Sequence, residues 1–528
     1  MTPVLRLFLA KFALLLACVG LWADTRPNIL IILADDMGYS DLGCYGSEIK
    51  TPNLDRLASH GVRFSEFYNT ARCWPSRAAL MTGYYAQAVR RDQVPGVTSG
   101  AQGVRPNWAK LLPTHLQAVG YRTYHSGKWH IDGLPLKNGF EHSYSLNDHD
   151  RYFYPQQHTK DDVKLPPVAK DAGYYATVAI ADHAIACLQE HATAHVSEPF
   201  FSFVAFTSPH FPLQALPEDI AKYQDTYQGG WDAMRQARFE RQQKLGLGVR
   251  TLSATERNLG PPYAFPKAME QLGPNEVNRP ILWGDLTPSQ KTFQAAKMAV
   301  HAAMVDRMDH EIGRILEQIQ SMEAEENTLV IFLSDNGASA EMMVRGDGHS
   351  QQAPAGSAQT FLSLGPGWST MCNTPLRRHK TWVHEGGIAT PFIAYWPAGL
   401  LPQGSWCHEP AHLVDVVPTL LELAKAPALS SLPNQPAAPG KSLLALWKRP
   451  QENLGTRTFW WLHEGNAALR VGDWKVVKAK GDAWALYNLK DDRAEQNDLS
   501  AKDPQRLAQM TEAWERQNAE CVRLAKQK

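Results

Sequence analysis

The fold of this chain is decided by the stretch NILIILADD, residues 28–36, in which a continuous apolar run ends at two aspartates. Two later stretches have the same form: FFSFVAFTSPH at 200–210 and TLVIFLSDNG at 328–337. Continuous runs rich in β-branched and aromatic residues are typical of inner strands of a parallel sheet, covered on both faces. We therefore expect three buried strands, each followed at once by polar residues.

Helical sequence lies between these strands. The stretch 295–320 repeats apolar residues at helical spacing, which predicts a helix with one face in the core. Alternating strands and helices predict an α/β fold with a large, doubly wound mixed sheet, mostly parallel and flanked by helices. Ligands of such sheets bind beyond the carboxyl ends of the strands. The polar residues expected to meet at that edge are Asp35, Asp36, His210, Asp335 and Asn336. The stretch 227–290 has few long apolar runs and predicts an excursion around this site.

The sequence pattern changes toward the C-terminus. A proline-rich stretch at 427–450 is typical of a linker or surface excursion. Four short strand candidates follow between 457 and 489, with a hairpin turn at Gly472-Asp473, and a helix is expected at 504–525. They predict a small antiparallel sheet with one helix. The expected units are a signal peptide at 1–23, the main catalytic domain at 24–440 and a C-terminal subdomain at 441–528.

The charge balance restricts the partners of the chain. Lysine and arginine together number 53, and so do aspartate and glutamate. A nucleic-acid partner would require a basic excess, so we expect none, and any recognition of an anionic substrate must be local. A hydrophobic content of 44% over 528 residues fits a globular chain with a sizeable core.

The N-terminus has the form of an export signal. Arg6 and Lys11 accompany an apolar stretch at 7–21, which is shorter than the ~20 residues of a membrane-spanning helix. No other apolar run approaches that length, so we expect no transmembrane segment in the mature chain. Cleavage after Ala23 would release an exported protein, periplasmic or secreted. The run LLAC, ending at Cys18, also resembles a lipoprotein cleavage box, and anchoring through a lipidated Cys18 stays open.

Seven cysteines are scattered along the chain without a CxxC pair or zinc-type spacing. A dense disulfide framework is not expected in a chain this long, although one or two disulfides stay open. The simplest interpretation of most of these residues is a small buried hydrophobe.

Two acidic pairs stand at equivalent strand ends. Asp35 and Asp36 follow the first strand, and Asp335 and Asn336 follow the third. Four oxygen-bearing side chains, three of them carboxylates, suit a hard divalent cation such as calcium or magnesium. Zinc is not favoured, because neither pair is accompanied by His or Cys at ligand spacing. Each pair taken alone could instead cap a helix or form a turn.

Cys73 opens the run CWPSR at 73–77. Pro75 suits the first turn of a helix that the next residues, AALM, continue. Cys73 would then lie at a helix N-terminus, where the dipole favours an anion, with Arg77 one turn away on the same face. These residues alone leave two interpretations open, a thiolate nucleophile and a buried structural cysteine.

The same run matches the C-x-P-S-R signature of the type I sulfatases of the alkaline phosphatase superfamily. Further blocks match in family order: RPN at 26–28, ADDMG at 34–38, TPNLD at 51–55, AALMTG at 78–83, GKWH at 127–130, SPH at 208–210, SDNG at 334–337 and TPLR at 374–377. The ordered set extends from Arg26 to about Asn497 and covers nearly the whole mature chain. The chain therefore resembles a formylglycine-dependent sulfatase, similar to bacterial arylsulfatases, and the resemblance implies an alkaline phosphatase-like fold.

The resemblance implies that a formylglycine-generating maturation enzyme converts Cys73 to formylglycine (3-oxoalanine), an aldehyde active as its hydrate. One hydroxyl of the hydrate can attack sulfur and form a sulfo-enzyme intermediate, and the other can then expel sulfate and restore the aldehyde. Asp335 would accept the nucleophile's proton. One calcium ion is also implied, with magnesium as the alternative. Its ligands would be Asp35, Asp36, Cys73, Asp335 and Asn336.

By the same resemblance, the catalytic residues are Cys73, Arg77, Lys128, His130, His210 and Lys380. Arg77 would orient the hydrate, while Lys128 and Lys380 would grip the sulfate and stabilise its charge. His130 would take the proton of the second hydroxyl during release. His210, together with Lys380, would protonate the leaving oxygen.

The implied reaction is hydrolysis of sulfate monoesters, with aryl sulfates as assay compounds and a sulfated carbohydrate as the natural substrate. Two alternatives stay open. A phosphonate monoester or phosphodiester hydrolase of the same superfamily could use the same modified cysteine, although a single metal ion with flanking lysines suits a singly charged sulfate. A non-catalytic glycan-binding protein on a decayed fold would have lost a motif residue, and none is missing.

One departure from the family pattern precedes Lys380. Many relatives have two glycines where this chain has Arg378 and His379. Bulky cationic side chains there could narrow the pocket or add a contact to an anion. Some bacterial members carry a similar arginine-rich version followed by WVHEGG, as at 382–387. The departure makes it unsafe to transfer a substrate from other members.

Overall fold

The computed structural model describes residues 26–527, except 149–150, 266, 346–347 and 400–402. The predicted export signal at 1–23, its cleavage point and Cys18 lie outside the described residues. Within the described part of the chain, no helix is both long and apolar enough to cross a bilayer.

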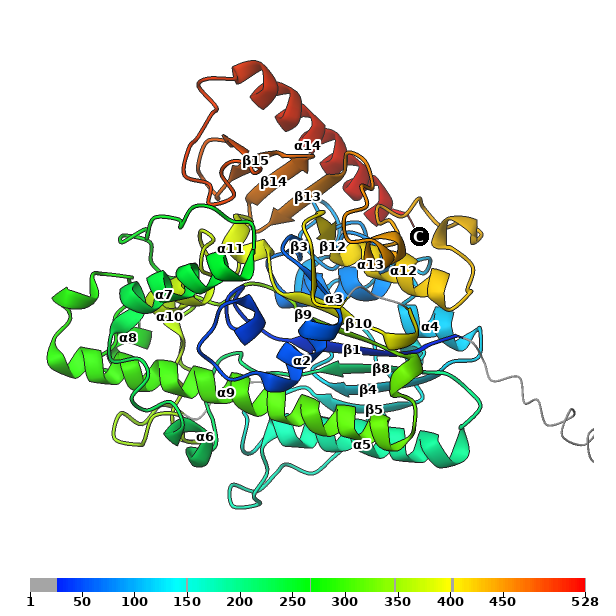
Figure 1. Cartoon of the computed structure of the whole chain (residues 1–528), viewed down its shortest axis with the longest axis horizontal. Coiled ribbons are helices and arrows are strands. Elements are labelled where there is room, and N and C mark those ends of the chain that lie inside the picture. The colour runs from blue at the N-terminus through cyan, green and yellow to red at the C-terminus, as the bar shows by residue number, and fades with distance from the viewer. Residues whose placement is uncertain (1–25, 149–150, 266, 346–347, 400–402, 528) are drawn as a thin grey trace, which may run out of the picture.

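A ten-stranded mixed sheet forms the centre of the molecule (Figure 1). Its strands follow the order β11-β2-β10-β9-β1-β8-β4-β5-β6-β7. The run from β9 to β5 is parallel, whereas β10 and β6 pair antiparallel with their inner neighbours. The strand bounds are β1 Asn28–Ala34, β2 Val62–Phe64, β4 Arg122–Gly127, β5 His142–Leu146, β6 His158–Lys160, β7 Val163–Lys164, β8 Phe200–Ala205, β9 Thr328–Ser334, β10 Phe392–Tyr395 and β11 Ser405–Cys407. A separate pair consists of β3 Phe67–Tyr68 and β12 Ala411–His412.

Helices cover both faces of this sheet. Alternate residues of β1 face two hydrophobic layers. Leu30 and Ile32 pack with the helices α5 (Ala176–Ala194) and α9 (Pro288–Ser321), whereas Ile31 and Leu33 pack with α3 (Cys73–Thr82), α4 (Leu112–Gln117) and α12 (Val416–Leu423). The predicted doubly wound, mostly parallel α/β sheet is therefore confirmed. The helix bounds are α2 Pro52–His60, α3 Cys73–Thr82, α4 Leu112–Gln117, α5 Ala176–Ala194, α6 Pro217–Ala221, α7 Gly230–Leu245, α8 Ala268–Leu272, α9 Pro288–Ser321, α10 Gly365–Cys372, α11 Glu385–Ile388, α12 Val416–Leu423 and α13 Leu444–Lys448.

The long helix α9 begins earlier than the apolar periodicity predicts. It starts at Pro288 rather than near residue 295, because Thr287 caps it. The Thr287 hydroxyl accepts a hydrogen bond from the backbone N–H of Gln290, and the Gln290 side chain accepts one from the backbone N–H of Thr287. This capping box, with proline at the first helical position, is a local signal that extends the helix beyond its buried stripe.

The C-terminal subdomain has the predicted composition. Four antiparallel strands pair in sequence order, and a terminal helix packs against them (Figure 1). The turn predicted at Gly472-Asp473 joins the second and third of these strands. The bounds are β13 Thr458–His463, β14 Asn466–Val471, β15 Trp474–Lys478, β16 Ala485–Asn488 and α14 Pro504–Ala525. The boundary at residue 440 stays a prediction.

A buried charge network joins this subdomain to the main domain. The Nζ atom of Lys475 on β15 lies 2.8 Å from Oε1 of Glu385 in α11 and 2.9 Å from Oε1 of Glu495. Arg493 donates to the other Glu385 oxygen at 3.1 Å. Burial makes each of these charges depend on its partners.

The six cysteines in the described part of the chain are all buried and form no disulfide, as expected of small hydrophobes.

We predict that Lys475→Met lowers the free energy of unfolding by about 3–5 kcal/mol, because it leaves two buried carboxylates with too little compensating charge. Chemical denaturation followed by tryptophan fluorescence would measure the change. The matched control is Lys490→Met at an exposed position of the same subdomain. Equal effects of the two substitutions would contradict a structural role for the network.

Candidate active site

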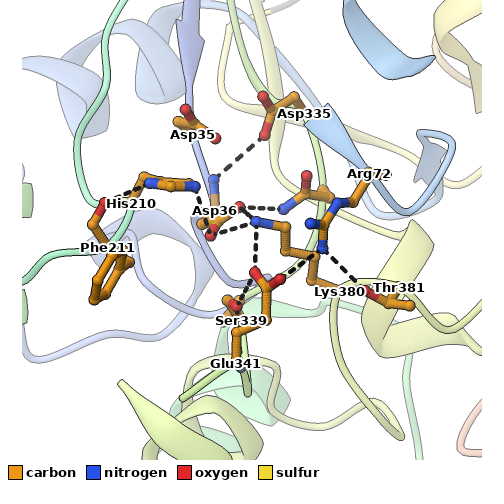
Figure 2. A network of polar contacts seen from close by, with 12 residues as sticks. Asp35, Asp36, Arg72, His210, Phe211, Asp335, Ser339, Glu341, Lys380 and Thr381 are labelled. Atoms are coloured by element: carbon orange, nitrogen blue, oxygen red, sulfur yellow. Dashed lines mark hydrogen bonds and ion pairs between the residues drawn. The ribbon is translucent and has the colours of Figure 1, made fainter. Parts of the chain in front are cut away.

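Two carboxylates leave the central sheet side by side. In the parallel pair β1 and β9, Ala34 lies opposite Ser334, so Asp35 and Asp335 follow at adjacent strand ends. Asp36 adopts a left-handed backbone conformation, with φ of 65°, and its N–H points to Oδ1 of Asp335 at 3.3 Å. Such a conformation is uncommon outside glycine, although aspartate adopts it more readily than most residues. Figure 2 shows the three carboxylates converging on one region.

Arg77 holds this pair together from the first turns of α3. The side chain is fully buried. Its Nε and Nη2 atoms lie 3.0 Å and 2.9 Å from Oδ2 of Asp335, and Nη2 lies 3.4 Å from Asp35. Its Nη1 atom donates to the backbone carbonyl of Lys128 at 2.6 Å. Arg77 therefore fixes the carboxylates and the segment after β4 at once.

Two buried lysines complete the charge balance. The Nζ atom of Lys128 lies 2.6 Å from Oδ2 of Asp35, and that of Lys380 lies 2.8 Å from Oδ1 of Asp36. Burial disfavours the charged form of Lys380, but Asp36 and Glu341 outweigh it and raise its pKa above the ordinary value. The site therefore presents two ammonium groups beside three carboxylates.

The two strand-end aspartates differ in proton affinity. Burial tends to raise the pKa of Asp35, but Lys128, His210 and Arg77 outweigh it and hold that pKa well below its usual range. Burial and the neighbouring charge of Asp35 raise the pKa of Asp335. The cluster therefore has an affinity for a further positive charge, either a proton or a cation.

Oxygen atoms of the cluster suit a metal ion. Within the described part of the chain, no hydrogen-bond donor contacts Oδ1 of Asp35 or Oδ1 of Asn336, although both atoms are buried. Buried polar atoms are normally paired, so these two are candidates for cation ligands. Asp35, Asp36 and His210 also offer ligand atoms within 4.8 Å of one another. The donor set is mostly oxygen and fits calcium or magnesium.

Cys73 is the first residue of α3, as predicted, and its exposed fraction is 3%. Burial raises the pKa of its thiol, although Lys128 and Lys380 partly oppose this effect. An unmodified thiol here would be largely neutral, whereas a thiolate nucleophile requires a lowered pKa. The site therefore disfavours the thiolate interpretation of Cys73.

The two predicted histidines occupy different places. The Nε2 atom of His210 lies 3.9 Å from Oδ2 of Asp36, while its Nδ1 atom contacts the Phe211 carbonyl at 2.5 Å (Figure 2). Burial and the charge of Lys128 lower the pKa of His210. His130 lies at the edge of the site, with its ring centroid 5.8 Å from that of Trp74, the residue after Cys73. The structure thus gathers all the predicted polar side chains around the carboxyl edge of the sheet.

Three contributors escaped the sequence interpretation. Glu341 bridges Lys380 and Arg72, with oxygens 3.0 Å and 2.8 Å from their nitrogens (Figure 2). Arg72 immediately precedes Cys73, and its guanidinium lies between the rings of Trp74 and Tyr263, 5.1 Å and 5.2 Å from their centroids. Two of them had a signal in the sequence: Glu341 is an acidic residue in the loop after β9, and Arg72 is a cation directly before the Cys73 signature. No feature of the sequence pointed to Tyr263.

The departure before Lys380 does not add a cation to the site. Arg378 lies 3.3 Å from Glu256, which it shares with Arg377. His379 contacts the Ser369 hydroxyl, and burial lowers its pKa to about 3, so its ring is neutral. Arg378 is thus paired with an acidic residue and His379 is neutral.

These features define an esterase-like hydrolase for anionic esters, with a buried cationic and oxygen-rich centre at the carboxyl edge of an alkaline phosphatase-like sheet. Residues 27–426 match the Sulfatase family model, so the chain belongs to the type I sulfatase family of the alkaline phosphatase superfamily. It is accordingly an enzyme that hydrolyses sulfate esters.

Relatives and solved structures agree with this assignment. An uncharacterized sulfatase of Schizosaccharomyces pombe is 31% identical over 93% of each chain. The arylsulfatase of Klebsiella aerogenes is 30% identical over 80% of this chain and 92% of its own. The structure of Ps i-CgsB with k-i-k-neocarrahexaose has a TM-score of 0.67 at 24% identity, covering 95% and 94% of the two chains. That of BT4656 with its substrate D-glucosamine-2-N,6-O-disulfate has a TM-score of 0.63 at 21% identity, covering 94% and 98%. At such identities these two structures show the fold alone.

We predict that Glu341→Ala lowers kcat for an aryl sulfate about 10- to 100-fold, because small displacements of a positioned group have effects of this size. Its loss would release Lys380 and Arg72 from their shared anchor. Steady-state kinetics would measure the change, with Glu317→Ala at an exposed position of α9 as the control. Unchanged kcat in Glu341→Ala would show that Asp36 alone positions Lys380.

Proposed function

We propose that this sulfatase removes sulfate monoesters from carbohydrates, with a nucleophile made from Cys73 and the assistance of one calcium ion. The observation that carries the proposal is the position of Cys73. It lies at the N-terminal end of α3, near enough to Lys128, Lys380 and Asp35 for their charges to influence its thiol. A nucleophile there would face a sulfate held by two ammonium groups.

Conversion of Cys73 to formylglycine would supply a hydrated aldehyde, which offers both an attacking hydroxyl and a route to sulfate release. The raised pKa of the thiol supports this conversion, because the unmodified side chain is a poor nucleophile. The conversion requires a formylglycine-generating maturation enzyme. Arg77 is held by Asp335 and the Lys128 carbonyl, so it is a rigid partner for orienting the nucleophile.

A calcium ion bound here would act as a Lewis acid on the sulfate oxygens. The residues that would hold it are Asp35, Asp36, the modified Cys73, Asp335 and Asn336. The unpaired Oδ1 atoms of Asp35 and Asn336 support this ligand set. Neutralisation of the carboxylates by the ion would free Lys128 and Lys380 to donate to the sulfate.

Proton transfer is assigned to the residues around this centre. Asp335, whose pKa is raised by burial and by Asp35, would accept the nucleophile's proton. His210 would protonate the leaving oxygen, together with Lys380. Burial lowers the pKa of His210 in the free enzyme, and the negative charge of a bound sulfate would oppose that effect. His130 would take a proton during sulfate release.

A carbohydrate substrate is supported by what related folds bind. The two solved structures named above hold a neocarrahexaose and a disulfated glucosamine. Export, as the N-terminal sequence predicts, would place the enzyme where polymeric glycans occur, in the periplasm or outside the cell. Anchoring through Cys18 remains the alternative form of export.

Maturation is the most direct test of the mechanism. In active enzyme, mass spectrometry of the peptide containing Cys73 should show loss of the thiol and gain of an aldehyde, while the buried Cys372 keeps its thiol. Cys73→Ala should abolish turnover of an aryl sulfate and leave the circular dichroism spectrum unchanged. Fully active enzyme with an intact Cys73 thiol would contradict the mechanism.

The same assay separates the proposal from its main rival. An aryl sulfate, an aryl phosphate and a phosphodiester are compared as substrates of the matured enzyme. We expect the sulfate to have the highest kcat/KM, because two lysines and one divalent cation match a singly charged group. A phosphodiester rate well above the sulfate rate would favour the phosphonate or phosphodiester hydrolase.

Calcium should also stabilise the folded protein, because a ligand that binds only the native state adds about 2.7 kcal/mol at a hundredfold excess over its Kd. We expect calcium to raise the Tm of chelator-treated enzyme and Asn336→Ala to lose most of that increase. Differential scanning fluorimetry would measure both, with Asn518→Ala on α14 as the control. An equal increase in Asn336→Ala would place the ion elsewhere.

A further inference from the structure

A cavity lies next to the active site and is not used by the reaction described above. Its volume is about 340 Å³. Most of its wall comes from the excursion between α7 and α9, and Met342 from the loop after β9 also contributes. The lining residues that matter here are Tyr263, Phe265, Asn278, Arg279 and Met342.

Two residues of the cavity wall, Met342 and Tyr263, lie next to residues of the catalytic centre. Met342 follows Glu341, whose carboxylate contacts both Lys380 and Arg72 (Figure 2). The ring of Tyr263 faces the guanidinium of Arg72 at 5.2 Å, and Arg72 precedes Cys73. The Tyr263 hydroxyl also lies 3.5 Å from Oγ1 of Thr381, the residue after Lys380. The cavity therefore lies next to the segments that carry Arg72, Cys73 and Lys380.

The lining has the chemistry of a sugar subsite. Phe265 has an exposed fraction of 41%, which is high for so large an apolar side chain, and its ring lies at 69° to that of Tyr263 with centroids 6.5 Å apart. Rings with one open apolar face can pack against the C–H face of a sugar. A cavity near the lower end of the ligand-pocket range, about 300–1,000 Å³, is large enough for one sugar residue.

Arg279 supplies a cationic group to the cavity wall. It is exposed on the cavity wall, and in the described part of the chain no carboxylate lies within ion-pair distance of it. Most other arginines near the site are already paired, Arg72 with Glu341 and Arg378 with Glu256. An unpaired guanidinium in a partly enclosed site favours a planar or tetrahedral anion.

We propose that the cavity binds the sugar residue joined to the sulfated one, and that Arg279 pairs with an anionic group on that neighbouring residue. The anion is a carboxylate or a second sulfate ester. This inference rests on the proposed carbohydrate sulfatase function and narrows it to acidic oligosaccharides of at least two residues. Phe265 supplies the apolar contact and Arg279 the charge selection.

The test compares three kinds of defined substrate that carry the same sulfated residue: a monosaccharide, a disaccharide with a neutral neighbour and disaccharides with an anionic neighbour. The anionic neighbour is prepared in two forms, a uronic acid and a sulfated neutral sugar, which distinguishes the two sources of charge. We expect kcat/KM to be highest for an anionic disaccharide. Arg279→Ala should reduce the preference for anionic over neutral neighbour about tenfold or more, since hydrogen bonds to charged groups have effects of this size.

Two further variants test the apolar contact and control for a general effect of losing an arginine. Phe265→Ala should lower kcat/KM for both kinds of disaccharide relative to the monosaccharide. Arg449→Ala, at an exposed arginine outside the cavity, should leave all the ratios as in the wild type. Equal neutral-to-anionic ratios in wild type and Arg279→Ala, for both anionic forms, would overturn the inference.

Binding measured without turnover separates this inference from the proposed function. The affinity of Cys73→Ala for each disaccharide is determined by isothermal titration calorimetry, with and without Arg279→Ala. Binding that weakens about tenfold or more on loss of Arg279 supports the subsite even if the matured enzyme hydrolyses none of the sulfated sugars, which would defeat the proposed function alone. Affinities that do not depend on Arg279 overturn the subsite even if every sulfate is released.

Discussion

The active site depends on the repulsion between two carboxylates that parallel pairing forces together. Strands β1 and β9 are in register, so Asp35 and Asp335 emerge next to each other in a buried region. Uncompensated charges at such a place would be strongly destabilising. Arg77 compensates the charge of both aspartates. Because it also donates to the Lys128 carbonyl, it connects the start of α3 to the end of β4. The position of Cys73 four residues earlier is a consequence.

The parts of this arrangement that repeat along the sequence were predictable. Continuous apolar runs predict the inner strands, because a strand such as β1 is almost fully excluded from solvent on both faces. Polar residues after each run predict the edge of the sheet where ligands bind. The start of α9 at Pro288 was missed because capping, rather than apolar spacing, determines it. Tyr263 could not be predicted, because it lies in an irregular excursion whose path depends on tertiary contacts with Arg72 and Glu464. The direction of Arg378 likewise depends on Glu256, more than a hundred residues away.

Burial sets the chemical character of Cys73. A thiol in this position is shielded from solvent, and the lysines that could stabilise a thiolate are themselves paired with Asp35 and Asp36. The site therefore gives a thiol little activation, and its lysines would be available to an incoming anion only once a cation neutralised Asp35 and Asp36. That combination is consistent with the modification proposed for Cys73, in which reactivity comes from an aldehyde rather than from the thiol.

Residues next to the catalytic centre are also contacted by the C-terminal subdomain, which lies beyond the matched family region ending at residue 426. The turn between β13 and β14 reaches the site: Glu464 accepts a hydrogen bond from the Tyr263 hydroxyl at 2.8 Å, and Asn466 donates to the Thr381 carbonyl at 3.2 Å. In the same hairpin, the ring of His463 lies 5.9 Å from that of Trp74. The buried network around Lys475 holds β15, which pairs with β14, against the main domain. The docking of this small sheet therefore helps to position Tyr263 and Thr381, and loosening it would disturb the contacts that these residues make with Glu464 and Asn466.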